Sequence, residues 1–142
     1  MDDNKLLSEE DIRFHLSALK KLAMADGVYD DSEKRFIDQI TQVYISSYPD
    51  LDFETMQKKE LSDEEYAQGL ENLKQNKLRA KLLLKDLITL GHADGDYSEP
   101  ERKLVQEISE KLNLSKEYVR LLEKAVDDML RATLFMNNVL FS

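Results

Sequence analysis

Apolar residues recur every three or four positions along most of the chain, which is the spacing of one helix face. The first such stripe is Ile12, Leu16, Leu19 and Leu22. Ser8, followed by acidic residues, has the character of an N-cap, and Gly27 suits the left-handed residue that ends a helix. The pattern predicts a helix up to about Asp26 and a second helix from about Asp31 to Ser47.

The second half of the chain continues this pattern with clear helix starts. Ser62 and Glu65 form one capping box, Ser98 and Glu101 form another, and Ser115 caps a last helix. The segment from Lys77 to Asp94 is apolar on every face, which is typical of a helix at the centre of a bundle. Boundaries within residues 49–76 stay open, because the helix that begins at Ser62 either stops near Asn76 or runs on. The fold expected is an all-α helical bundle of six or seven helices, a single domain over residues 1–142.

Two stretches of the chain nearly repeat each other at an offset of 68 residues. Each reads A-D-G-x-Y-x-x-x-E, from Ala25 to Glu33 and from Ala93 to Glu101. Between residues 22–40 and 90–108, seven of nineteen positions are identical, where unrelated segments would share about one. We therefore expect a duplicated helix-loop-helix unit, with internal repeats at about 12–48 and 80–116.

Composition narrows the class of protein. The 142 residues include 42% hydrophobic and 35% charged residues, no cysteine and a net charge of −9. The chain has no apolar run near the roughly 18 residues of a membrane span and no leader pattern. We expect a cytoplasmic protein with no transmembrane segment, no thiol chemistry and no nucleic acid partner, since phosphate binding needs a basic face.

Negative charge is concentrated in the two repeated loops. Residues 26–33 and 94–101 together carry eight carboxylates and no lysine or arginine. Capping boxes at the start of the next helix, tyrosines packed under the loop and glycines that end the preceding helix explain much of each loop's sequence without any ligand. Asp26 and Asp94, however, are expected in the last turn of a helix, where the helix dipole opposes a carboxylate.

A divalent cation would offset both the unfavourable interaction of these aspartates with the helix dipole and the repulsion among the loop carboxylates, because hard cations take oxygen ligands from clustered acids. The candidate metal ligands are Asp26, Asp30, Glu33, Asp94, Asp96 and Glu101, with calcium or a similar ion as the cofactor. Each loop matches the later half of a calcium-binding EF-hand loop but lacks its first two ligands, so water, carbonyls or the other loop must complete the site.

The paired A-D-G-x-Y-x-x-x-E motif, each copy following one apolar helix and opening another, resembles the TerB-like family, the tellurite resistance protein B group. The resemblance covers roughly residues 10–130. It implies an all-α fold of two pseudo-symmetric halves, no catalytic activity, and metal binding or sensing in a cytoplasmic, membrane-associated stress response. By motif match, Asp26, Glu33, Asp94 and Glu101 occupy the acidic positions of the family.

Other features leave alternatives open. His92 is either a metal ligand or a partly buried helix residue, and His15 is expected at the surface. The apolar tail at residues 134–141 either folds back on the bundle, which we favour because exposed apolar patches are uncommon on monomers, or forms a contact surface for a homodimer or another partner.

Three classes of function follow. The first is a metal-binding regulatory module using the loop carboxylates. The second is a metal-free docking module, which would bind protein partners, possibly at a membrane surface, through the acidic loops and the tail. The third is an enzyme with paired carboxylates. We rank the enzyme last, because no Ser–His–acid arrangement, phosphate-binding glycine loop or H-E-x-x-H motif is present.

Overall fold

The computed structural model describes residues 7–27, 29–58, 60–93 and 95–142. These residues form seven helices and no strand. The helices are α1 (Glu9–Ala23), α2 (Asp31–Ser47), α3 (Phe53–Lys58), α4 (Asp63–Lys74), α5 (Lys77–Gly91), α6 (Glu99–Lys111) and α7 (Lys116–Phe141). The predicted all-α fold is confirmed, and none of the described helices is both long enough and apolar enough to cross a membrane.

Local capping chemistry sets where the helices begin. All seven start after a residue whose side chain accepts a hydrogen bond from a backbone N–H three residues further on: Ser8, Asp30, Asp52, Ser62, Asn76, Ser98 and Ser115. The cap at Asn76 resolves the open boundary, because Asn76 has an extended backbone and accepts from the Arg79 N–H. The chain therefore forms two helices here, α4 and α5, rather than one.

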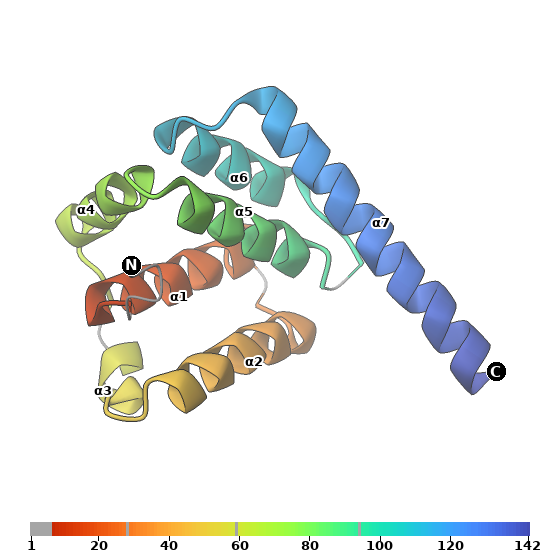
Figure 1. Cartoon of the computed structure of the whole chain (residues 1–142), viewed down its shortest axis with the longest axis horizontal. Coiled ribbons are helices and arrows are strands. Elements are labelled where there is room, and N and C mark those ends of the chain that lie inside the picture. Colours follow the sequence, from red (N-terminus) through yellow and green to blue (C-terminus); the bar gives the residue numbers. More distant parts are fainter. Residues whose placement is uncertain (1–6, 28, 59, 94) are drawn as a thin grey trace.

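Helix α5 is the centre of the bundle, as its apolar sequence predicts. It packs against α1, α2, α4, α6 and α7, and Figure 1 shows it between α1 and α6. Its buried residues are Ala80, Leu83, Leu84, Leu87, Ile88, Leu90 and Gly91. Leu78 and Leu82 are exposed, so one side of α5 is open to solvent in spite of its apolar residues.

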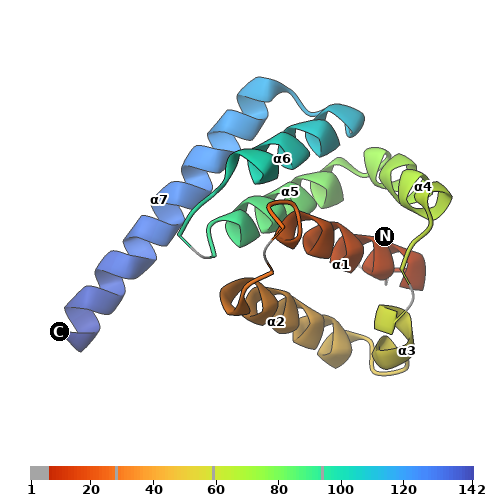
Figure 2. The ribbon, with the colours of Figure 1, turned by 180° about the vertical axis from the view of Figure 1, so that it is seen from behind.

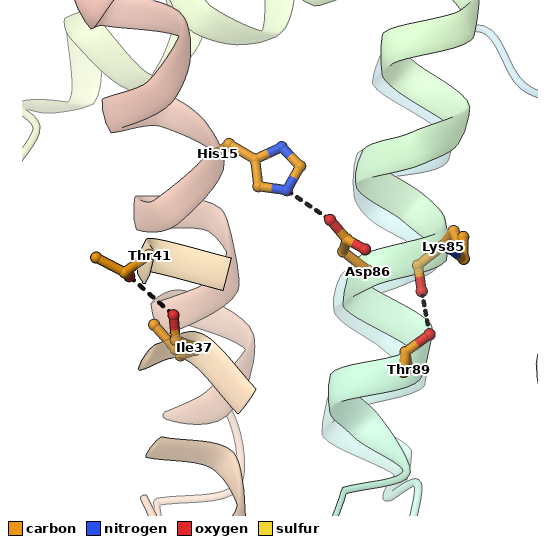
Figure 3. Close-up of polar contacts among 6 residues, drawn as sticks. All are labelled: His15, Ile37, Thr41, Lys85, Asp86 and Thr89. Atoms are coloured by element: carbon orange, nitrogen blue, oxygen red, sulfur yellow. Dashed lines mark hydrogen bonds and ion pairs between the residues drawn. The ribbon is translucent and has the colours of Figure 1, made fainter. Parts of the chain in front are cut away.

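A polar contact joins α1 to α5 inside this core. His15 is buried, and its Nε2 lies 2.8 Å from Oδ2 of Asp86 (Figure 3). The prediction that His15 is a surface residue is wrong, because the α1 face that carries it packs against α5. Figure 3 also shows two threonine hydroxyls that donate to carbonyls one turn earlier, Thr41 to Ile37 and Thr89 to Lys85.

Helix α7 leaves the bundle. It runs for 26 residues and contains no glycine or proline, so nothing interrupts it. Its first half lies along α5 and α6, and its second half projects beyond the other helices in both views (Figures 1 and 2). The favoured prediction for the tail, that it folds back on the bundle, is wrong. Met129, just before this segment, is also exposed.

Candidate functional site: two acidic loops and a pair of buried glutamates

The two repeated loops lie at the same end of the bundle, one joining α1 to α2 and the other joining α5 to α6 (Figures 1 and 2). Gly27 and Gly95 have φ angles of 85° and 86°, the left-handed conformation that glycine adopts most readily. Their N–H groups donate to the carbonyls of Met24 and His92, each at 3.0 Å. The two glycines therefore have the same backbone conformation and the same N–H hydrogen bond.

Glu33 lies at the start of α2 with its side chain turned inward. It is 1% exposed. Its Oε1 accepts a hydrogen bond from the Asp30 N–H at 3.1 Å, and Asp30 Oδ1 accepts one from the Glu33 N–H at 2.9 Å. Oε2 of Glu33 is buried and accepts no hydrogen bond. In the described part of the chain, no ion pair involves Glu33.

Glu101 has the matching position at the start of α6. Its side chain is fully buried, and its Oε1 accepts a hydrogen bond from the Ser98 N–H at 2.8 Å. Ser98 Oγ accepts from the Glu101 N–H at 3.4 Å, which closes the capping box. Both predicted capping boxes are confirmed, with the addition that their glutamates are buried.

The electrostatics of Glu33 connect the two loops. Burial raises the pKa of Glu33 to about 7, and the hydrogen bond from Asp30 opposes this rise. The negative charges of Asp30, Glu101 and Asp26 raise the pKa further. Glu101 lies 68 residues away in sequence, so its effect on Glu33 shows that the fold brings the two glutamates within electrostatic reach of each other.

The remaining candidate residues are less enclosed. Asp30 is half-buried as the N-cap of α2, whereas Asp26 and Asp96 are exposed. Asp94 lies outside the described residues. Helix α1 ends at Ala23, so Asp26 lies in the turn beyond it. The prediction that Asp26 occupies the last helical turn is wrong, and the dipole argument for a cation weakens at that position, since the effect falls off within one turn.

The described residues do not form a complete metal site. Among them, no group of three or more histidine, aspartate or glutamate side chains is placed to hold an ion. The structure brings Glu33 and Glu101 into one electrostatic neighbourhood, with Asp30 and Asp26 near Glu33. Any further ligand has to come from Asp94, from water or from backbone carbonyls.

Aromatic residues pack beneath the loops. Tyr97 is buried, its hydroxyl donates to Glu123 of α7 at 2.9 Å, and burial raises its pKa, with a further rise from that carboxylate. The ring of His92 lies 5.0 Å from the Tyr97 ring. His92 is half-buried, which agrees with the alternative that it is a partly buried residue rather than a metal ligand. It is the C-cap of α5 and does not lie within the helix.

A cavity of about 260 Å³ lies beside α1, α2 and the segment between α3 and α4. Its lining combines apolar side chains with Arg13, Lys20, Asp38 and Glu60. None of the six candidate acids lines it, so it is separate from the loop carboxylates. The sequence patterns did not reveal this cavity, because its walls come from segments far apart in the chain.

Sequence reasoning also missed the burial of Glu33 and Glu101. A capping box predicts the hydrogen bonds of these residues but says nothing about which way the carboxylate faces. One signal was available, because glutamate occurs at this position in both repeats whereas the N-cap changes from Asp30 to Ser98.

Comparison with protein families identifies the chain. The family model of tellurite resistance protein TerB matches residues 51–124, a span that includes the second acidic loop and more than half of the chain. No curated protein and no solved structure matches it. The family match agrees with the all-helical fold and with the resemblance carried by the paired A-D-G-x-Y-x-x-x-E motif. This chain belongs to the TerB family.

Proposed function

We propose that this protein is a non-enzymatic module that binds or senses a divalent cation at its paired loop glutamates, in a cytoplasmic stress response of the tellurite-resistance type. The observation that carries the proposal is the pair Glu33 and Glu101, two buried carboxylates from matching loops, close enough for one to raise the pKa of the other.

A buried carboxylate without a positive neighbour is unfavourable unless it takes a proton or meets a cation. Glu33 has one buried oxygen without a hydrogen bond, and no ion pair within the described residues. Above pH 7 the proton of Glu33 is lost, and a divalent cation becomes the effective way to neutralise this carboxylate.

The donor chemistry fits a hard cation. Carboxylate oxygens suit calcium, magnesium and manganese, and both glutamates are held in place by their capping hydrogen bonds. Two protein carboxylates do not fill a coordination sphere of six or more. We expect Asp94, water and backbone carbonyls to supply the remaining ligands, and the affinity to be modest.

Thermal unfolding of the EDTA-treated protein at pH 8 tests the proposal, with calcium, magnesium, manganese and zinc added one at a time. An ion present at about 100 times its Kd should stabilise the fold by about 2.7 kcal/mol. For a domain of this size, the Tm should rise by roughly 5–10 °C.

Three variants test whether the ion-dependent rise in Tm depends on the two buried glutamates. Glu33→Gln and Glu101→Gln should lose the ion-dependent rise in Tm. Glu65→Gln should keep it, because Glu65 closes the same kind of capping box on α4 but is exposed. Asp94→Asn then tests the additional ligand. The proposal fails if no ion raises the Tm of the wild type, or if Glu33→Gln responds as the wild type does.

A metal-free docking module is the second candidate. It is favoured by the exposure of Asp26 and Asp96 and of the projecting half of α7. Charge reversal, Asp26→Lys with Asp96→Lys, should then remove a basic partner from a pull-down while leaving the Tm unchanged. EDTA should have no effect on that binding, whereas it should change the behaviour of a metal-dependent module.

A further inference from the structure

The projecting half of α7 continues an apolar stripe that begins inside the bundle. The stripe follows a seven-residue repeat and consists of Val119, Leu122, Val126, Met129, Thr133, Met136 and Leu140. Alternate spacings of three and four residues place such a stripe along one side of a helix, as at the core positions of a coiled coil.

The structure divides this stripe into a covered part and an open part. Val119 and Val126 are buried against the bundle. Met129, Met136 and Leu140 are 43%, 55% and 62% exposed. Thr133 fits the stripe because its hydroxyl donates to the Met129 carbonyl at 2.9 Å, so only its methyl group needs an apolar neighbour.

The projecting half of α7 carries many exposed apolar side chains. Seven apolar side chains of this segment are more than two-fifths exposed: Met129, Leu134, Phe135, Met136, Val139, Leu140 and Phe141. With about 3.6 residues per turn, Met129, Met136, Val139 and Leu140 lie on one side of α7, and Leu134, Phe135 and Phe141 lie on its other sides. Exposed apolar side chains gathered on one side of a helix mark a contact surface.

We propose that this surface is covered by a second copy of the chain, with residues 129–141 of the two α7 helices packed antiparallel. The spacing of the stripe is self-complementary in this arrangement. Met129 of one copy meets Leu140 of the other, and Thr133 meets Met136, with the twofold axis between Leu134 and Phe135. Each contact occurs twice, as an isologous interface requires.

Charge and shape favour a second copy over other occupants. Residues 129–142 carry a single charged side chain, Arg131, so the segment offers little to a charged peptide or to an anionic membrane. Arg131 pairs with Asp127 on the side of the helix away from the stripe. Because α7 projects from one corner of the bundle (Figures 1 and 2), an antiparallel pair of these segments places the two bundles at opposite ends of the pair. The inference does not depend on metal binding.

Cysteine cross-linking tests both the association and its direction, since the chain contains no native cysteine. Met129→Cys protein mixed with Leu140→Cys protein should form a disulfide-linked pair under mild oxidation. Each variant alone should stay unlinked, because an antiparallel pair separates identical positions by eleven residues along the axis, about 16 Å, beyond the roughly 7 Å limit for a disulfide. Efficient linking of each variant with itself would overturn the antiparallel arrangement.

Light scattering of the full chain tests the dimer itself. The wild type should have twice the 16.5 kDa mass of one chain, and Met136→Lys with Leu140→Lys should have the monomer mass. Asn138→Lys, on the side of α7 away from the stripe, is the matched control and should remain a dimer. Because this segment contributes no residue to the buried core, circular dichroism of all three proteins should show the same helical content. A monomeric wild type, or a monomer that binds lipid vesicles through this segment, would overturn the proposal.

Discussion

Four helices of this protein begin with the same capping box, and the acidic residue that closes each box is Asp11, Glu33, Glu65 or Glu101. The hydrogen bonds are equivalent, but only Glu33 and Glu101 are buried. Identical local chemistry therefore has different electrostatic consequences. At α4 the carboxylate is exposed and lies 3.7 Å from Nη1 of Arg13, whereas at α2 and α6 it is buried, and the charge of Glu101 acts on Glu33.

We predict that Glu33→Gln makes stability less dependent on pH. The pKa of Glu33 is raised in the folded state from the ordinary value of 4.5 to about 7, so the folded state binds more protons than the unfolded state between these values. Stability is then fully present below about pH 4.5 and is lost as the pH rises through 7, by at most about 3 kcal/mol. Glutamine keeps the acceptor for the Asp30 N–H but cannot ionise.

Urea unfolding in EDTA at pH 5.5, 6.5 and 8 measures this effect. The free energy of unfolding of Glu33→Gln relative to wild type should rise with pH, by about 2 kcal/mol across the series. The control Glu65→Gln should differ from wild type by a constant amount. A pH-independent difference for Glu33→Gln would show that Glu33 titrates normally in the folded protein.

A second prediction at this scale concerns Gly69 in α4. A Cβ atom at this position would lie 2.4 Å from Cδ1 of Phe14 in α1. Helix propensity alone would make Gly69→Ala stabilising by about 1 kcal/mol, but the close contact should reverse the sign and destabilise by about 1–3 kcal/mol. Chemical denaturation measures the difference. Ala67→Gly, at an exposed position of the same helix, measures the difference in helix propensity between alanine and glycine without the close contact. A stabilised Gly69→Ala protein would contradict the prediction.

At the scale of elements, the contact between α1 and α5 organises the bundle. Both helices end in an acidic loop, so the way they pack fixes how far apart the two loops lie. Their interface is mostly aliphatic, and His15 and Asp86 form a polar contact within it (Figure 3). This partly buried polar contact favours one alignment of the two helices, since sliding either helix would separate His15 from Asp86.

We predict an energetic coupling between His15 and Asp86. In a double-mutant cycle with His15→Ala and Asp86→Ala, the coupling should be about 0.5–3 kcal/mol, the usual range for residues in contact. Urea unfolding of the four proteins at pH 7 provides the measurement. As a reference, the exposed pair Lys124 and Asp128, at 2.9 Å, should give a coupling of about 0.3–0.5 kcal/mol. Strictly additive effects of the His15 and Asp86 substitutions would show that the contact does not hold the helices in register.

At the scale of the whole molecule, a six-helix body and the first half of α7 form the bundle, and the second half of α7 extends from it (Figure 1). The buried residues of α7 are Val119 and Val126. Leu130 packs against the core from its margin. The bundle should therefore be stable without the part of α7 beyond Arg131.

We predict that a protein truncated after Arg131 folds and unfolds cooperatively, with a Tm that does not depend on protein concentration. The Tm of the full chain should rise with concentration, because association stabilises the folded state by mass action. Differential scanning calorimetry over a hundredfold range of concentration provides the comparison. If the truncated protein fails to fold, the projecting half of α7 contributes to the bundle and the described division is wrong.

The helical class, five of the helix starts and the central position of α5 could be predicted from the sequence. These features depend on signals that act within about four residues, namely caps and the spacing of apolar side chains. The glycine turns at Gly27 and Gly95 belong to the same group, because a left-handed turn is a local requirement. The six candidate acids were identified by their density in the two loops, which is likewise visible in the sequence.

Only the tertiary structure decided which of these residues are enclosed. His15, Glu33 and Glu101 are buried because helices distant in sequence cover them, and no local pattern encodes what lies across an interface. The same reason applies to α7. Its apolar stripe runs without interruption from Val119 to Leu140, and the sequence alone determined that it is a helix with one apolar side. The bundle ends near Leu130, so the half of the apolar side of α7 that lies beyond Leu130 remains exposed. Only the tertiary structure shows this.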